Sequence, residues 1–466
     1  MTSATTTEER EPVDFALIPL GVEVAVPRTL RQITPYVLKE QGDWFEDEIK
    51  FIRKIIEPGS RALDIGANHG VYALTLARLV GPSGKVWAIE PDPLPMGRLR
   101  RSVARNKFGN VTLIEAGLSN HVGRAPLYTS GHSELNSLTG ASGSASHEIE
   151  LKTLDGCVRE HEIEKIDFVK LDAEGEEARI LEAAGEFLKN EDPVIMFELK
   201  HGDQLNLPLI KQFQSLGYDS YRLVPGLDVL IPFSADSKPD GFLLNLFVCK
   251  KSRAASLEKE GILATVLEKP KGDSGADWKS HLAPFPYAQL LSDKWKSAPK
   301  EPGWENYEKA LELYVRAHAP GVAPGARFML LNESLQLLAG LFPIHANFSR
   351  GQTLARVAWE LGLRQSAIQV LTMLVGLFES NQQLKLDEPF LPVSPRYEMV
   401  DPKQSLGQWC LSAILEQRET LRTFSSFFET EPAIPTLEAI ATLGFQSEAM
   451  KRRLEVMKSK ASGQSG

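Results

Sequence analysis

Short apolar segments alternate with amphipathic segments over the first half of the chain. Positions from Phe45 to Ile56 carry apolar residues at spacings of three and four, which predicts an amphipathic helix that ends before Pro58-Gly59. The strands that the pattern predicts next are Arg61–Ile65, Lys85–Glu90, Val111–Glu115, Ile166–Asp172, Val194–Leu199, 219–224 and 243–250. Helical patterns separate most of them, and this alternation predicts an open α/β sheet, largely parallel, with helices on both faces.

The pattern changes along the rest of the chain and divides it into regions. Residues 1–12 are predicted to be a flexible tail, 13–251 the α/β domain, 252–300 a linker rich in Pro, Gly, Lys and Ser, and 301–466 an all-α domain. Small residues at the helix crossings of the last region are typical of stacked hairpins of the tetratricopeptide type. A clean period of about 34 residues is absent, so a plain helical bundle is an equal alternative.

Composition and charge limit the classes of partner. The chain has 466 residues, of which 42% are hydrophobic and 24% charged, and its net charge is −9. This balance predicts neither a nucleic-acid partner nor an anionic membrane surface. No apolar run reaches 18 residues, the first residues lack the pattern of a secretory signal, and three scattered cysteines form no CxxC pair. We therefore expect a cytoplasmic protein without a transmembrane segment.

A glycine-rich turn is the clearest chemical feature of the sequence. Leu63-Asp-Ile-Gly-Ala-Asn-His-Gly70 joins the strand at 61–65 to a helix, and such a turn lets the backbone approach a ligand closely. A dinucleotide site would need G-x-G-x-x-G for its two phosphates. The acid Asp64 beside the glycines instead suits the ammonium and carboxylate of S-adenosylmethionine.

Acids also stand at the ends of two other predicted strands. Glu90 ends the strand at 85–90, where a carboxylate can accept hydrogen bonds from both hydroxyls of a ribose. Asp172 and Glu174 follow the strand at 166–172 and would lean over the same crevice as general base or acceptor-orienting groups. The alternative for Glu174 and Glu176 is a purely structural role at a helix N-terminus.

These segments, together with Ala88–Pro93, Ala116–Asn120 and Val194–Leu199, resemble the FkbM family of S-adenosylmethionine-dependent methyltransferases over about residues 40–250. The resemblance implies a seven-stranded Rossmann-like class I methyltransferase sheet that methylates hydroxyls, and sometimes amides, of polyketides, sugars and peptides. It places the methionine end of the cofactor at Asp64, Gly66, Asn68 and Gly70, the ribose at Glu90, the adenine near Leu118, and methyl transfer near Asp172 and Glu174.

Several further residues are candidates without a strong pattern. Tyr36 and Trp44 are expected either to cover the cofactor or to lie in the core. His69 has a side chain suited to a base. His132, Ser133, Asn136 and Ser137 lie in the Ser/Gly/Thr-rich insertion at 120–153, and His201, with Glu198 and Lys200 beside it, follows the strand at 194–199. No His, Asp or Glu spacing predicts a metal site.

The prediction is therefore a methyltransferase that O-methylates a hydroxyl of a sugar, glycan or other secondary metabolite, with Asp172, Glu174 or His69 as catalytic residues. The helical region 301–466 would recognise a carrier, a glycan or a partner protein, or mediate self-association. The alternative from a different class is a non-catalytic scaffold that works through those helices. A nicotinamide-dependent oxidoreductase is disfavoured by Asn68 at a glycine position, and a sugar-nucleotide enzyme by the lack of Lys and Arg between Asp64 and Thr75.

Overall fold

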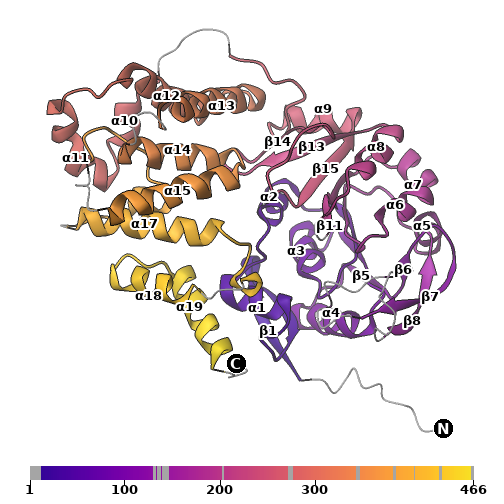
Figure 1. Ribbon diagram of the computed structural model, residues 1–466. Coiled ribbons are helices and arrows are strands. Elements are labelled where there is room, and N and C mark those ends of the chain that lie inside the picture. The colour runs from indigo at the N-terminus through magenta and orange to yellow at the C-terminus, as the bar shows by residue number, and fades with distance from the viewer. Residues whose placement is uncertain are drawn as a thin grey trace.

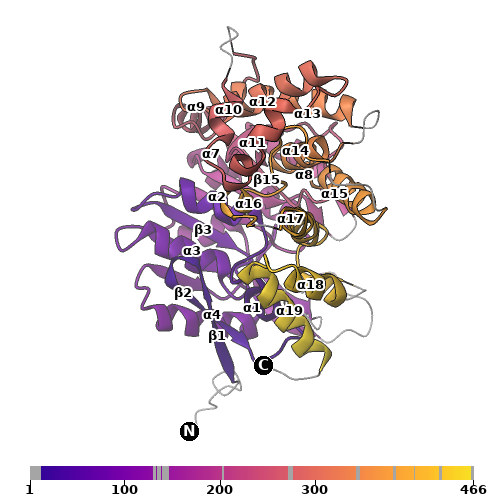
Figure 2. The same ribbon diagram turned by 90° about the vertical axis from the view of Figure 1, so that its left-hand side faces the viewer.

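The computed structural model describes residues 12–129, 133, 138, 146–201, 204–270, 276–342, 347–380, 385–403, 405–429 and 433–462. An eight-stranded mixed sheet with helices on both faces lies beside a stack of helices (Figures 1 and 2). No helix in these ranges is long and apolar enough to cross a membrane.

The central sheet contains the seven predicted strands and one more at its edge. Its order is β14-β13-β15-β10-β9-β3-β4-β5, in which the five strands from β10 to β5 are parallel and β15 runs antiparallel to β10. The bounds are β3 Arg61–Ile65, β4 Lys85–Ile89, β5 Val111–Ile114, β9 Phe168–Leu171, β10 Val194–Glu198, β13 Tyr218–Val224, β14 Val229–Pro232 and β15 Asn245–Lys250. The chain leaves β3 toward β4 and later returns to its other side with β9, which creates a switch point where such sheets bind ligands.

Two apolar layers cover the sheet. One contains α2 (Asp47–Ile55), α3 (Val71–Val80) and α9 (Lys251–Lys259), and the other contains α5 (Leu154–Glu160), α6 (Glu177–Glu182), α7 (Gly185–Asn190) and α8 (Leu207–Ser215). The hairpin β1 (Val13–Ile18) and β2 (Val22–Pro27) packs against α4 (Pro93–Asn106), and α1 (Ile33–Gln41) follows it.

The insertion 120–153, expected to be a loop, contains two strands in its described part. β7 (Gly123–Tyr128) and β8 (Ser146–Lys152) pair with β6 (Gly117–Leu118) in a small separate sheet. A two-residue pair, β11 (Lys200–His201) and β12 (Gln204–Leu205), completes the strands. Leu127, Ile149 and Leu151 of the small sheet are buried together in one apolar cluster. Their burial favours strands in a segment that is otherwise polar.

The segment 252–300, expected to be a linker, is largely helical, and this expectation is wrong. It contains α9, α10 (Trp278–Leu282) and α11 (Pro286–Ser297), and Trp278, Tyr287 and Trp295 are buried in the core of the helical region. Burying three large aromatic side chains favours helices here in spite of the many polar residues.

The helical region is a stack in which successive helices of nine residues or more pack on one another (Figure 1). Its members are α12 (Trp304–Ala317), α13 (Pro324–Leu341), α14 (Phe348–Glu360), α15 (Arg364–Glu379), α16 (Arg396–Met399), α17 (Leu406–Leu421), the short 3-10 helix η4 (Ser426–Phe428), α18 (Ile434–Thr442) and α19 (Glu448–Ala461). The last helix returns to the α/β domain and packs against α1, which places η4 near the carboxyl end of the sheet.

Candidate functional site

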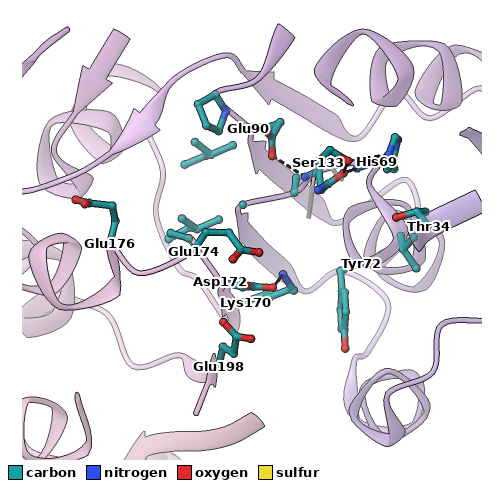
Figure 3. A pocket seen from close by; sticks show the side chains of 18 of the residues that line it. Thr34, His69, Tyr72, Glu90, Ser133, Lys170, Asp172, Glu174, Glu176 and Glu198 are labelled. Carbon is teal, nitrogen blue, oxygen red and sulfur yellow. Dashed lines mark hydrogen bonds and ion pairs between the residues drawn. The ribbon is translucent and has the colours of Figure 1, made fainter. Parts of the chain in front are cut away.

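A cavity of about 510 Å³ opens at the carboxyl ends of β3, β4, β9 and β10 (Figure 3). Its size is typical of a site for small molecules. The wall contains Gly66, Asn68, Glu90, Asp172 and Glu174, so five residues singled out in the sequence meet at one place.

The glycine turn after β3 forms the floor of this cavity. The backbone N–H groups of Gly66 and Ala67 donate to the carbonyl of Ile89 on β4, over 3.0 and 2.9 Å. Gly66 has a φ of 78°, and a Cβ built there would lie 1.7 Å from the carbonyl oxygen of Asp172. Only glycine therefore lets the turn pass so close to the end of β9.

Asp64 and Gly70, both predicted to hold the methionine end of the cofactor, are not among the residues that line the cavity. Asp64 is fully buried beneath the turn, no described side chain donates to its carboxylate, and burial raises its pKa to about 6. Gly70 precedes α3 with a φ of 84°, and a Cβ there would lie 2.2 Å from Leu99 Cδ1. Both residues shape the turn from below.

Glu90 follows β4 and holds the glycine turn from the other side. Its Oε2 accepts a hydrogen bond from the backbone N–H of Asn68 over 2.8 Å, and its Oε1 accepts one from Asp92 N over 2.9 Å. The residue is buried but lines the cavity, and burial raises its pKa to about 8. Carboxylate oxygens have further lone pairs, so Glu90 can also accept hydrogen bonds from hydroxyl groups of a ligand.

Charged side chains gather at the end of β9. The ammonium of Lys170 lies 2.7 Å from Asp172 Oδ2 and 5.2 Å from the centre of the Tyr72 ring. Burial lowers the pKa of Lys170, but the charges of Asp172 and Asp64 outweigh it and raise the pKa above its ordinary value. Glu174 also lines the cavity and has a φ of 51°.

Two further acids in the cavity wall were not assigned a role from the sequence. Glu198 ends β10, and its pKa is raised to about 10, first by burial and then by the charges of Asp172 and Glu174. Glu46 precedes α2 and accepts a hydrogen bond from the hydroxyl of Tyr72, and burial raises its pKa. The end of a central parallel strand was a usable signal for Glu198, whereas Glu46 reaches the site from a distant helix start.

Three carboxylates are close enough together to surround a cation. One carboxylate oxygen from each of Asp172, Glu177 and Glu198 lies within 4.8 Å of the other two. The Lys170 ammonium already neutralises Asp172, and Glu177 Oε1 accepts hydrogen bonds from the backbone N–H groups of Ala173 and Gly175 over 2.8 and 3.2 Å. We assign no metal to this cluster.

One end of the cavity is apolar, and Leu118, predicted to lie near the adenine, is part of it. Leu118 lines the cavity with Ala116, Leu127 and Ile149, which come from the strand ends and the small sheet. The side chains of this end provide a surface for a flat, weakly polar group.

His69 lies in the wall and is almost fully buried. Its Nε2 is 3.1 Å from the hydroxyl of Ser133, which also donates to Asn68 Oδ1 over 3.1 Å. The candidates His132, Asn136 and Ser137, and the side chain of His201, lie outside the described residues.

Comparison with known proteins identifies the centre of the chain. A family model described as "Methyltransferase FkbM domain" matches residues 64–220. Residues 64–220 are therefore similar to the FkbM methyltransferase domain. The match begins at Asp64, near the end of β3, and includes β4, β9 and β10, and hence the cavity-lining turn, Glu90, Asp172, Glu174 and Glu198.

Each relative matches only part of this chain, and the chain spans less than two thirds of the length of these curated relatives. Methyltransferase sdnD from Sordaria araneosa is 30% identical over 156 residues, which is 27% of this chain and 60% of the relative. Protein-L-isoaspartate O-methyltransferase from Methanothrix thermoacetophila is 36% identical over 59 residues, 13% of this chain and 28% of the relative. The solved structure of a SAM dependent methyltransferase from Aquifex aeolicus has a TM-score of 0.27 and 16% identity, covering 46% of this chain and 91% of that one.

Residues outside the FkbM domain complete the cavity. Trp44 and Phe45 line it from the N-terminal side, and Phe424 and Phe428 line it from the helical region. Tyr36, expected as a cover for the cofactor or a core residue, does not line the cavity. It is almost fully buried against Phe427, whose ring centre is 5.4 Å away.

Proposed function

We propose that the protein is an S-adenosylmethionine-dependent methyltransferase whose cofactor occupies the cavity at the carboxyl end of the sheet. The observation that carries this proposal is Glu90, which is hydrogen-bonded to the glycine turn and faces the cavity within the matched FkbM domain. Two oxygens on one carboxylate suit the two hydroxyls of a ribose.

The residues present fit the other parts of the cofactor. Leu118, Leu127 and Ile149 offer an apolar surface to the adenine, and the turn from Gly66 to Asn68 offers backbone groups to the methionine end. Asp64, buried beneath the turn, and Asp172, partly buried in the cavity wall, make this end of the cavity attractive to an ammonium group.

The bound cofactor would supply a methyl group made electrophilic by its sulfonium. The task of the chain is then to align the acceptor with that methyl group and to exclude water. We propose Asp172 as the group that accepts the proton of an acceptor hydroxyl, with Lys170 holding its carboxylate in place over 2.7 Å. Glu174 and His69, both in the cavity wall, are the other candidates for this proton transfer.

We propose a hydroxyl of a sugar, glycan or other secondary metabolite as the acceptor. Support comes from the FkbM match and from the acids Glu46, Asp172, Glu174 and Glu198, which line the cavity and can form hydrogen bonds with hydroxyl groups as acceptors or, when protonated, also as donors.

Calorimetric titration of the full chain with S-adenosylhomocysteine tests the proposal. Glu90→Ala should weaken binding by about 10- to 100-fold, the effect of losing hydrogen bonds to a charged group. Glu115→Ala is the matched control, since Glu115 follows the neighbouring strand β5 but is exposed, and it should bind as the native chain does. The absence of binding to the native chain, or equal binding by both variants, would overturn the proposal.

A further inference from the structure

Four aromatic side chains form a continuous wall on one side of the cavity. This aromatic wall consists of Trp44, Phe45, Phe424 and Phe428. The ring centre of Phe45 lies 4.6 Å from that of Trp44, 5.4 Å from that of Phe424 and 6.2 Å from that of Phe428. Half of the wall therefore comes from the C-terminal helical region, far outside the matched family domain.

The segment that carries the two C-terminal rings is fixed to the α/β domain by a buried acid. Glu40, on α1, is 1% exposed and accepts hydrogen bonds from the hydroxyls of Ser425 and Ser426 over 2.5 and 2.6 Å. Its Oε1 also accepts from the backbone N–H of Ser426 over 3.1 Å and from Arg453 Nε over 2.7 Å. A buried carboxylate with this many donors holds its partners in one arrangement.

Phe424 is held from two further sides. Its carbonyl accepts a hydrogen bond from Gln41 Nε2 over 2.6 Å. The guanidinium carbon of Arg364 lies 4.7 Å from the centre of its ring, and Arg364 Nη2 donates to the carbonyl of Thr423 over 2.7 Å. The ring is thus a fixed part of the cavity wall and not a loosely attached side chain.

Phe428 is 48% exposed although it lines the cavity. An aromatic ring left half in water at the cavity, next to other partly buried rings, has apolar surface that a ligand can cover. The polar groups of Asp172, Glu198 and Asn245 line the same cavity. A molecule bound in it would therefore have both aromatic faces and hydrogen-bonding groups within the same wall.

We propose that the helical region supplies the acceptor-binding wall of the cavity, and that Phe424 and Phe428 determine specificity for an acceptor that presents the face of a ring. The ring, from a sugar or an aromatic compound, packs on the two phenylalanines while its hydroxyls face Asp172 and Glu198. This inference rests on the proposed methyltransferase function. It gives the helical region a direct part in the site instead of a separate scaffold role.

Saturation-transfer NMR on the full chain holding S-adenosylhomocysteine tests this assignment. The probes are methyl β-glucopyranoside and catechol, which have rings, and glycerol, which has hydroxyls but no ring. At least one ring probe should bind the native chain, and glycerol should give no saturable signal. Phe428→Ala and Phe424→Ala should weaken ring binding at least fivefold, whereas Phe15→Ala, which removes an exposed phenylalanine of β1 that does not line the cavity, should leave it unchanged.

The same samples are titrated with S-adenosylhomocysteine in the calorimeter. Binding of S-adenosylhomocysteine by Phe428→Ala would show that this variant is folded. Because Phe428 is half exposed, replacing it should disturb the fold less than replacing Phe424. No ring binding to the native chain, equal ring binding in all variants, or equal binding of glycerol would overturn the inference while leaving the cofactor site intact. Loss of S-adenosylhomocysteine binding in the native chain would instead remove the proposed function itself.

Discussion

Replacing Gly66 with alanine tests the close approach between the glycine turn and β9. The residue has a φ of 78°, and the new Cβ would lie 1.7 Å from the carbonyl oxygen of Asp172 and 2.9 Å from its carbonyl carbon. An alanine at positive φ costs about 1–2 kcal/mol, and forcing extra volume into a packed site costs about 1–3 kcal/mol more. Together these give a destabilisation of about 2–5 kcal/mol.

Equilibrium unfolding in urea measures this loss, with Gly217→Ala as the matched control. Gly217 has a φ of 85°, and nothing lies within 4 Å of its Cβ position, so that variant carries the backbone cost of about 1–2 kcal/mol alone. Gly66→Ala should also bind S-adenosylhomocysteine at least tenfold more weakly, because either the turn or the end of β9 must move. Equal stability of the two variants, with normal ligand binding by Gly66→Ala, would refute the reasoning.

Three further outcomes follow from the charged groups. Because the pKa of Glu90 is raised to about 8, the fraction of its ionised form increases from pH 7 to pH 9. The ionised form can accept hydrogen bonds from both ribose hydroxyls, so calorimetry should show S-adenosylhomocysteine binding more tightly as the pH rises over that range. Glu90→Gln should show no such dependence on pH. The pKa of Glu198 is raised from 4.5 to about 10, so the native chain loses stability as the pH rises between these two values. Glu198→Gln should therefore raise the melting temperature more at pH 8 than at pH 5. An equal gain at both pH values would contradict the raised pKa. Glu388→Ala should cost about 3–5 kcal/mol in urea unfolding, since it leaves the buried Arg350 guanidinium unpaired, whereas Asp293→Ala, which breaks an exposed pair, should change stability by less than about 1 kcal/mol.

The α/β sheet and the centre of the site could be predicted because local patterns determine them. Each central strand is a short apolar run, and the glycine turn, Glu90 and Asp172 directly follow such runs. Since the carboxyl ends of parallel strands meet at one edge, order along the chain was enough to bring these residues together.

The segment 252–300 was mispredicted because its composition resembles that of a linker. Tyr287, Leu291 and Trp295 recur at a spacing of four and are all buried in α11, so a helical face was present among the polar and proline residues. The spacing of these three residues and their large apolar side chains were the signals of burial in this segment.

The contribution of Phe424 and Phe428 could not be predicted from local patterns. The two rings reach the cavity only because α19 returns to α1 and Glu40 binds the segment next to them. Such a contact depends on the packing of the whole helical stack, and no spacing along the chain encodes it. The same holds for Glu46, which enters the site from the start of α2.

A crystal structure of the full chain with S-adenosylhomocysteine tests the central claim most directly. The ribose hydroxyls should lie within hydrogen-bonding distance of Glu90, the adenine should pack against Leu118, and the sulfur should face Asp172. Binding at another surface, or in this cavity with the ribose away from Glu90, would contradict it.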